Sequence, residues 1–273
     1  MKASSVNRRH SISKGDPRKI AEALSAAAKL KLRPLCVYGS DRPPAEAIPA
    51  TDISSCLAEA VYALAENKRL SAIYIGGDSI KRCCTGGTTY LGFTEPSPYI
   101  KFFVSYGTKE FRNGAAEYLR ASPELVEENE RRTGKITPPG KYVVISPCSD
   151  LGDTAVDVRS LLMFGEPEQI RNLVTLVHFN SVDPFEEVLQ PSGPSCASFI
   201  TYAAGLAEKA PRNVAIVGPF DPTGNRWFPP DMMSLALPIG LAGRMYRDLP
   251  ESFLVKRSSV AFPSRRKHLK PRK

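Results

Sequence analysis

The chain has 273 residues, of which 42% are hydrophobic and 24% charged, and these proportions are typical of a globular protein and exclude a disordered one. No apolar run reaches the roughly 18 residues that a membrane-spanning helix needs, and the basic N-terminal stretch lacks the apolar segment of a signal peptide. We therefore expect a cytoplasmic protein whose six cysteines are reduced thiols or metal ligands rather than disulfide partners.

The net charge of +9 is concentrated at the two ends of the chain. Residues 1–19 hold six basic residues and one acidic residue, and residues 256–273 hold eight basic residues and no acidic one. Residues 20–255 carry 23 basic and 27 acidic groups. We expect two basic flexible tails, 1–19 and 256–273, flanking a single globular domain, 20–255. Nucleic-acid binding is then limited to weak contacts of the tails with phosphates, and no membrane contact is expected.

Between the tails, helix-like and strand-like segments alternate. A helix is expected over residues 17–32, where Ile20, Leu24 and Ala28 recur at helical spacing after Pro17. Segments 183–195 and 220–230 mix turn residues with aromatic residues and are expected to be ordered loops. Runs rich in β-branched or aromatic residues predict buried strands over residues 34–40, 71–77, 101–106, 141–147, 160–166 and 213–219. This order predicts an α/β fold with a mixed sheet, with α+β as the alternative class.

Two stretches of similar sequence begin at Cys56 and Cys196. In each, the cysteine is followed six residues later by Tyr-Ala (Tyr62 and Tyr202), then by Leu-Ala-Glu and a strand ending in Gly. The upstream strands, 34–40 and 160–166, are also comparable. The repetition predicts two related βαβ-like halves, 20–140 and 141–255, although two alanine-rich helices can also resemble each other by chance.

Each repeated cysteine lies near the expected start of a helix, where unpaired backbone N–H groups favour a thiolate. Cys196 follows Ser-Gly-Pro-Ser, which places it in the first helical turn, and we expect it to be the most acidic thiol. Cys56 follows four possible caps, Thr51, Asp52, Ser54 and Ser55, and it lies past the first turn if Thr51 caps the helix.

Cys84 adds a third thiol in the segment "KRCCTGG", residues 81–87. Gly86 and Gly87 let the backbone approach a ligand closely or adopt a positive φ. The alternative is a tight turn with a half-buried cysteine, since free cysteine is often buried.

Together these motifs resemble the archaeal and bacterial family called domain of unknown function 169 (DUF169). The resemblance rests on a cysteine that opens an apolar helix, C-x-G-G running into "YLGF", the segment "LLMFGEPEQIRNLV", an S-C helix and a late arginine before "LALP". It covers roughly residues 20–255 and implies no established activity. In this chain the family's positions fall on Cys56, Cys84, Cys196, Gly86, Gly87 and Arg226, whereas Cys36, Cys83 and Cys148 are additions.

Three thiolates from separate segments can hold an iron–sulfur cluster or a zinc ion, with a fourth position open for redox or small-molecule chemistry. Cys83 is a candidate fourth ligand, although adjacent residues in a strand point to opposite faces. The leading hypothesis is therefore a metal or iron–sulfur site formed by Cys56, Cys84 and Cys196.

Two alternatives stay open. One is a metal-free thiol enzyme or sensor, and the other is a binding module in which the cysteines only pack while Gly86, Gly87 and Arg226 line a small-molecule pocket, with Arg226 holding an anionic group. His178 is the one histidine outside the tails and is expected in the core, which disfavours Ser-His and Cys-His catalysis. No P-loop or G-x-G-x-x-G motif supports nucleotide binding. Whether the protein is an enzyme, and its oligomeric state, do not follow from the sequence.

Overall fold

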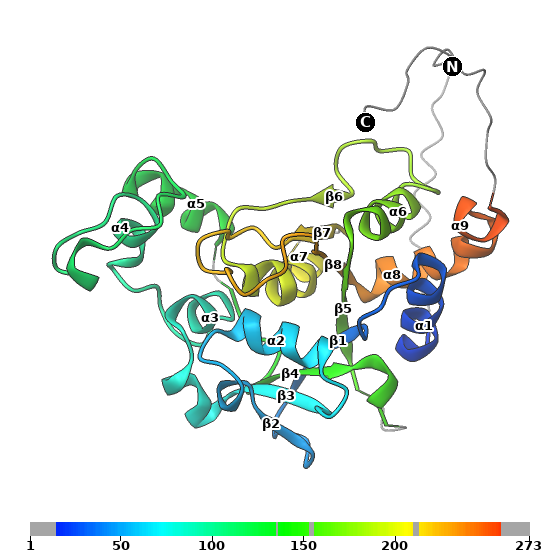
Figure 1. The fold of residues 1–273 in the computed structure, drawn as a ribbon, viewed down its shortest axis with the longest axis horizontal. Helices are drawn as coiled ribbons and strands as arrows, with labels where there is room; N and C mark the ends of the chain where they lie inside the picture. The colour runs from blue at the N-terminus through cyan, green and yellow to red at the C-terminus, as the bar shows by residue number, and fades with distance from the viewer. Residues whose placement is uncertain (1–14, 135, 153–155, 210–212, 258–273) are drawn as a thin grey trace, which may run out of the picture.

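The computed structural model describes residues 15–134, 136–152, 156–209 and 213–257. These residues form a mixed eight-stranded sheet with helices on both faces, which confirms the expected α/β class. In Figure 1, α1, α6 and α8 lie on one side of β5, and α2, α3 and α7 lie on the other. The strands are β1 (Leu35–Ser40), β2 (Ala47–Pro49), β3 (Ala72–Gly76), β4 (Tyr142–Pro147), β5 (Val158–Gly165), β6 (Val188–Leu189), β7 (Ala215–Gly218) and β8 (Met233–Pro238).

The helices vary from one turn to three turns in length. They are α1 (Pro17–Ala28), α2 (Leu57–Glu66), α3 (Thr85–Tyr90), α4 (Ile100–Val104), α5 (Pro123–Thr133), α6 (Pro167–Val177), α7 (Tyr202–Lys209), α8 (Ile239–Asp248) and α9 (Phe253–Lys256). A π-helical turn, Ala197–Thr201, leads directly into α7. Turns of 3₁₀ helix span Ala50–Asp52, Gly77–Arg82, Arg112–Gly114, Cys148–Asp150 and Leu249–Glu251.

The strand order across the sheet is β2-β3-β4-β1-β5-β8-β7-β6. Neighbouring strands are antiparallel, except for the parallel pairs β2–β3 and β6–β7 at the two edges. The order is therefore the same when it is read from either edge of the sheet. The strands β1, β2, β3 and β4 correspond to β5, β6, β7 and β8 in turn. Strands β3 and β7 share one sheet at equivalent positions, as two related halves require. The topological division falls between β4 and β5, later than the boundary between 140 and 141 considered from the sequence.

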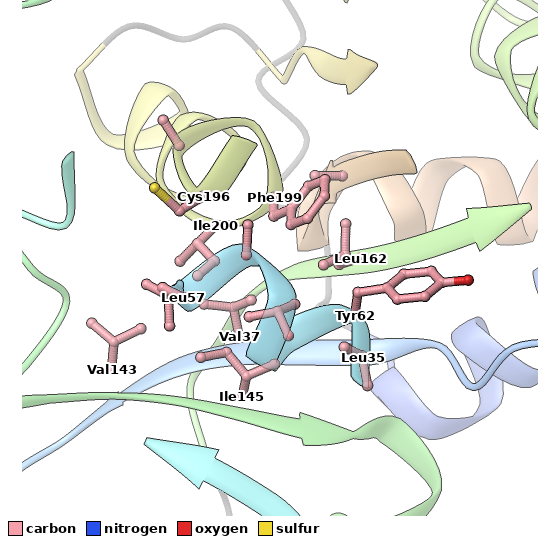
Figure 2. Packing of buried hydrophobic residues seen from close by; sticks show 14 of the residues in the cluster. Leu35, Val37, Leu57, Tyr62, Val143, Ile145, Leu162, Cys196, Phe199 and Ile200 are labelled. Atoms are coloured by element: carbon pink, nitrogen blue, oxygen red, sulfur yellow. The ribbon is translucent and has the colours of Figure 1, made fainter. Parts of the chain in front are cut away.

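Side chains of the central strands alternate between two hydrophobic clusters, one on each face of the sheet. Leu35 and Val37 of β1 pack with α2, whereas Cys36 packs on the opposite face with α1. Figure 2 shows Leu57 of α2 between the sheet and the helix that carries Cys196. On the face of the sheet that carries Leu35 and Val37, helices from both halves therefore pack over one shared core.

Several segments differ from the sequence-based expectation, which did not include the strands β2, β6 and β8. The strand predicted over residues 101–106 is wrong, because Ile100–Val104 forms helix α4 in the connection between β3 and β4. This connection extends away from the sheet (Figure 1), and its aromatic side chains pack on one another, with the Phe103 and Phe111 ring centroids 5.7 Å apart. The helix expected over 17–32 ends at Ala28, because Lys29 adopts the left-handed conformation at φ 59°.

Most of the two expected basic tails, residues 1–14 and 258–273, lies outside the described residues. The tail boundaries drawn from charge also include ordered structure, since α1 begins at Pro17 and α9 extends to Lys256. None of the helices in the described ranges combines the length and apolar character needed to cross a membrane.

Cys36 and Cys148 form a disulfide, with their Cα atoms 5.3 Å apart. The expectation that all six cysteines are free is therefore wrong for this pair. The cause is strand pairing: Cys36 faces Ser146 across β1 and β4, and the Cys148 N–H donates to the Pro34 carbonyl at 2.9 Å. The free thiols in the described residues are Cys56, Cys83, Cys84 and Cys196.

Candidate functional site

The three cysteines proposed as ligands lie on one face of the sheet, each at the beginning of a helix. Cys56 is the N-cap residue of α2, and Cys84 is the N-cap residue of α3. Cys196 has helical backbone angles and directly precedes the π-helical turn that continues into α7. Helix starts carry unpaired N–H groups, so this arrangement gathers hydrogen-bond donors around the sulfurs.

Two serines fix the start of α2 against the start of α3. The Ser54 Oγ accepts a hydrogen bond from the Cys56 N–H at 3.0 Å and donates one to a Glu59 carboxylate oxygen at 2.5 Å. The Ser55 carbonyl accepts a hydrogen bond from the Cys84 N–H at 2.8 Å. This last bond holds the backbone of Cys84 beside that of Cys56.

The sulfur of Cys84 is the centre of the thiol cluster, which consists of Cys56, Cys83, Cys84 and Cys196. It accepts hydrogen bonds from the thiols of Cys56 and Cys83 and from the backbone N–H groups of Leu57 and Gly87, the last at 3.3 Å. Cys83 ends a 3₁₀ turn and Cys84 begins a helix, so the strand alternation that counted against Cys83 does not apply. The sequence-based argument therefore gave Cys83 too little weight as a member of the site. Its position next to Cys84 in the chain was the signal that could have identified it.

These contacts set the charge of the cluster. Hydrogen bonds from Cys56 and Cys83 lower the pKa of the Cys84 thiol well below its ordinary value, with further help from the Leu57 and Gly87 N–H groups. The same hydrogen bonds, followed by burial, raise the pKa values of Cys56 and Cys83. Burial, followed by the nearby Cys84 charge, raises the pKa of Cys196. The expectation that Cys196 is the most acidic thiol is therefore wrong, because it is only 4% exposed.

We expect the lowered pKa of Cys84 to appear in the pH dependence of its alkylation. An ordinary thiol loses reactivity roughly tenfold per unit as the pH falls below its pKa, because only the thiolate reacts. Cys84 in metal-free protein should lose distinctly less of its iodoacetamide rate than an ordinary thiol between about pH 8 and about pH 5. Mass spectrometry of the labelled peptides measures this rate, and a tenfold loss per pH unit at Cys84 would contradict the assignment.

The two glycines of "CTGG" have different surroundings. A Cβ on Gly87 would lie 2.9 Å from the Cys83 sulfur and 3.2 Å from both the Cys84 sulfur and the Leu57 Cβ. A Cβ on Gly86 would meet only the Pro194 Cβ, at 3.8 Å. Both glycines are helical residues of α3, so Gly87 is needed for space around the thiols rather than for an unusual backbone angle.

The loop after β7 confirms the prediction of an ordered loop over residues 220–230 and lies beside Cys196. The buried Asn225 amide donates hydrogen bonds to the Ser195 Oγ and to the Asp221 carbonyl. Arg226 itself is exposed, and among the described residues no hydrogen bond or ion pair joins it to the cysteines. Its role in ligand binding stays a prediction, and Asn225 is the loop residue that the sequence analysis missed.

A cavity of about 110 Å³ adjoins the helix that carries Cys196. Its walls come from the C-terminal end of α3, the end of α5 with the segment after it, and the π-helical turn with α7. The lining is largely apolar, with three threonine side chains. The lining residues are Leu91, Thr133, Ile136, Thr137, Pro139, Ile200, Thr201, Tyr202, Ala204 and Gly205.

The thiol cluster has the donor chemistry of a soft-metal site but not a finished coordination geometry. Within the described ranges, no three His, Cys, Asp or Glu side chains already have the spacing of a metal-ion site. Thiolate sulfurs are nevertheless the ligands preferred by zinc, copper(I) and iron–sulfur clusters. A metal would replace the thiol protons that Cys56 and Cys83 now direct at Cys84.

The family model of DUF169, described as "Uncharacterised ArCR", matches residues 23–248. The chain therefore belongs to this family, as its motifs indicated. No curated protein and no solved structure shows significant similarity to the chain. The family description names no activity, so the functional assignment depends on the geometry of the thiol cluster.

Proposed function

We propose that this member of the DUF169 family binds an iron–sulfur cluster or a zinc ion through Cys56, Cys84 and Cys196, with Cys83 as a fourth ligand. The observation that carries the proposal is that the Cys56 and Cys83 thiols lie within hydrogen-bonding reach of the Cys84 sulfur, while the buried Cys196 thiol, from a third segment, is near enough for the Cys84 charge to raise its pKa. A core that needed only apolar volume would be filled better by larger aliphatic side chains, which do not oxidise.

The surroundings of the thiols support this proposal. The N–H groups of Leu57 and Gly87 point at the Cys84 sulfur, and hydrogen bonds of this kind stabilise the negative charge of ligating thiolates. When bound by Cys56, Cys84 and Cys196 alone, the metal would supply redox chemistry or activate a small molecule at an open fourth position, and with Cys83 in that position the site would be closed. The chain's own residues would hold the sulfurs in place and exclude water, since Cys196 and the adjoining Ser195 are buried.

The test is purification without oxygen, followed by iron, sulfide and zinc analysis and a visible spectrum. We expect about one ion or one cluster per chain, and a loss of at least about tenfold in Cys84→Ser and Cys196→Ser. The matched control is the double variant Cys36→Ala/Cys148→Ala, which removes two sulfurs from the opposite face and should keep full metal content. A protein that takes up neither zinc nor a cluster after anaerobic reconstitution would contradict the proposal.

A metal-free thiol enzyme or sensor is the second candidate function, and the lowered pKa of Cys84 favours it specifically. In that case Cys84 rather than Cys196 is the nucleophile, because the thiolate is the reactive form. A chain that takes up no metal after anaerobic reconstitution and still reacts with an electrophile at Cys84 would support this candidate over the first.

The proposal includes a cytoplasmic location and a small-molecule ligand. Four neighbouring free thiols persist best in a reducing compartment, which supports the location, and the Cys36–Cys148 disulfide is buried away from soluble reductants. The cavity beside the π-helical turn supports the small-molecule part, because it adjoins the helix that begins at the thiol cluster. The exposed Arg226 is the candidate contact for an anionic group of that ligand.

A further inference from the structure

We propose that hydrogen peroxide converts the metal-free thiol cluster to a Cys56–Cys84 disulfide. This reaction goes beyond the proposed metal binding, since it needs only the apo chain. The contacts within the cluster carry the inference: the Cys56 and Cys84 side chains are within hydrogen-bonding reach of each other, and the Cys84 backbone is bonded to the residue that precedes Cys56.

The backbone geometry favours the same pair. The Cys84 N–H donates to the Ser55 carbonyl at 2.8 Å, which places the peptide that precedes Cys56 directly against Cys84. Both residues are partly exposed, so a small oxidant can reach the sulfurs. Cys196 is buried and is therefore a poor competitor for this reaction.

Cys83 also touches Cys84, but its position in the chain disfavours a bridge. Consecutive Cα atoms are roughly 3.8 Å apart across a trans peptide, and disulfides usually span roughly 4.4 to 6.8 Å between Cα atoms. A Cys83–Cys84 bridge would therefore distort the peptide that joins them. Cys56 comes from a different helix and is not restricted in this way.

The chemistry consumes one peroxide for each bridge. The Cys84 sulfur attacks one peroxide oxygen, an S–O bond forms, the O–O bond breaks and water leaves. The Cys56 sulfur then attacks the sulfur of the resulting sulfenic acid, an S–S bond forms, the S–O bond breaks and a second water leaves. The two thiols lose two electrons and two protons in total, and peroxide is reduced to water.

The experiment treats full-length, metal-stripped protein with hydrogen peroxide and maps the bridges by mass spectrometry of peptides. We expect the free thiols to fall from four to two, with a new Cys56–Cys84 link beside the existing Cys36–Cys148 link. In Cys56→Ser the link should be lost, and a sulfenic acid at Cys84 should be trapped by dimedone. In Cys83→Ser the new bridge should still join Cys56 to Cys84, since Cys83 is not a partner in it, and the double variant Cys36→Ala/Cys148→Ala on the opposite face should form the bridge at a rate within about twofold of wild type.

A new bridge that runs through Cys83 or Cys196, or no new bridge in a chain whose circular dichroism is native, would overturn the proposal. The result does not depend on metal content. A chain that never binds metal can still form the bridge, and a chain that binds metal can fail to form it, so the two proposals fail separately.

Discussion

Gly87→Ala is expected to lower metal content at least about tenfold and to destabilise the fold by about 1 to 3 kcal/mol. The added Cβ would lie 2.9 Å from the Cys83 sulfur and 3.2 Å from the Cys84 sulfur, so at least one sulfur must move. Movement of α3 would also disturb the Gly87 N–H that donates to Cys84. Metal analysis and urea unfolding measure the two effects.

The neighbouring substitution Gly86→Ala is the matched control. Its Cβ would meet only Pro194, at an ordinary contact distance of 3.8 Å, and alanine favours a helix over glycine by about 1 kcal/mol. We expect full metal content and equal or slightly higher stability. Equal behaviour of the two variants, whether both are impaired or both are normal, would show that the space around the thiols is not what requires Gly87.

Reduction of the Cys36–Cys148 disulfide is expected to lower the free energy of unfolding by about 4 to 5 kcal/mol. The bond closes a loop between residues 112 positions apart, and the chain-entropy model gives a penalty of this size for a loop of roughly 100 residues. Urea unfolding with and without a phosphine reductant measures the difference.

The double variant Cys36→Ala/Cys148→Ala is the control for this second prediction. Its stability should not respond to reductant and should lie near that of the reduced wild type, because both lack the cross-link. Identical unfolding midpoints for oxidised and reduced wild type would contradict the prediction.

The sequence was sufficient for the parts of the fold that depend on local pattern. Buried strands such as β1 and β5 contain apolar runs that end near Gly, and they were predicted within a few residues. Helix α4 was missed because "KFFVSY" is apolar and aromatic, and its helical form depends on the β3–β4 connection rather than on its own composition. The two-residue strand β6 has too little sequence to leave a pattern.

The candidate site was partly predictable in the same sense. Cys56, Cys84 and Cys196 were identified from helix starts and motif resemblance, and the structure brings their helices to one face. The distribution of charge among the thiols was not predictable, because it depends on which sulfur receives the S–H donors of its neighbours. Tertiary contact, not helix position alone, makes Cys84 the acidic thiol and buries Cys196.

The symmetric strand order has a consequence for the origin of the site. A protein made of one half would leave the edge of its β1-like strand unpaired, so two copies would associate there and place one cysteine from each copy at equivalent helix starts. In the present chain the long connection from β3 to β4 supplies Cys83 and Cys84, whereas β7 and β8 are joined by a short loop without cysteine. Gene fusion is what would let such a site become asymmetric, since one half can then acquire ligands that its counterpart lacks.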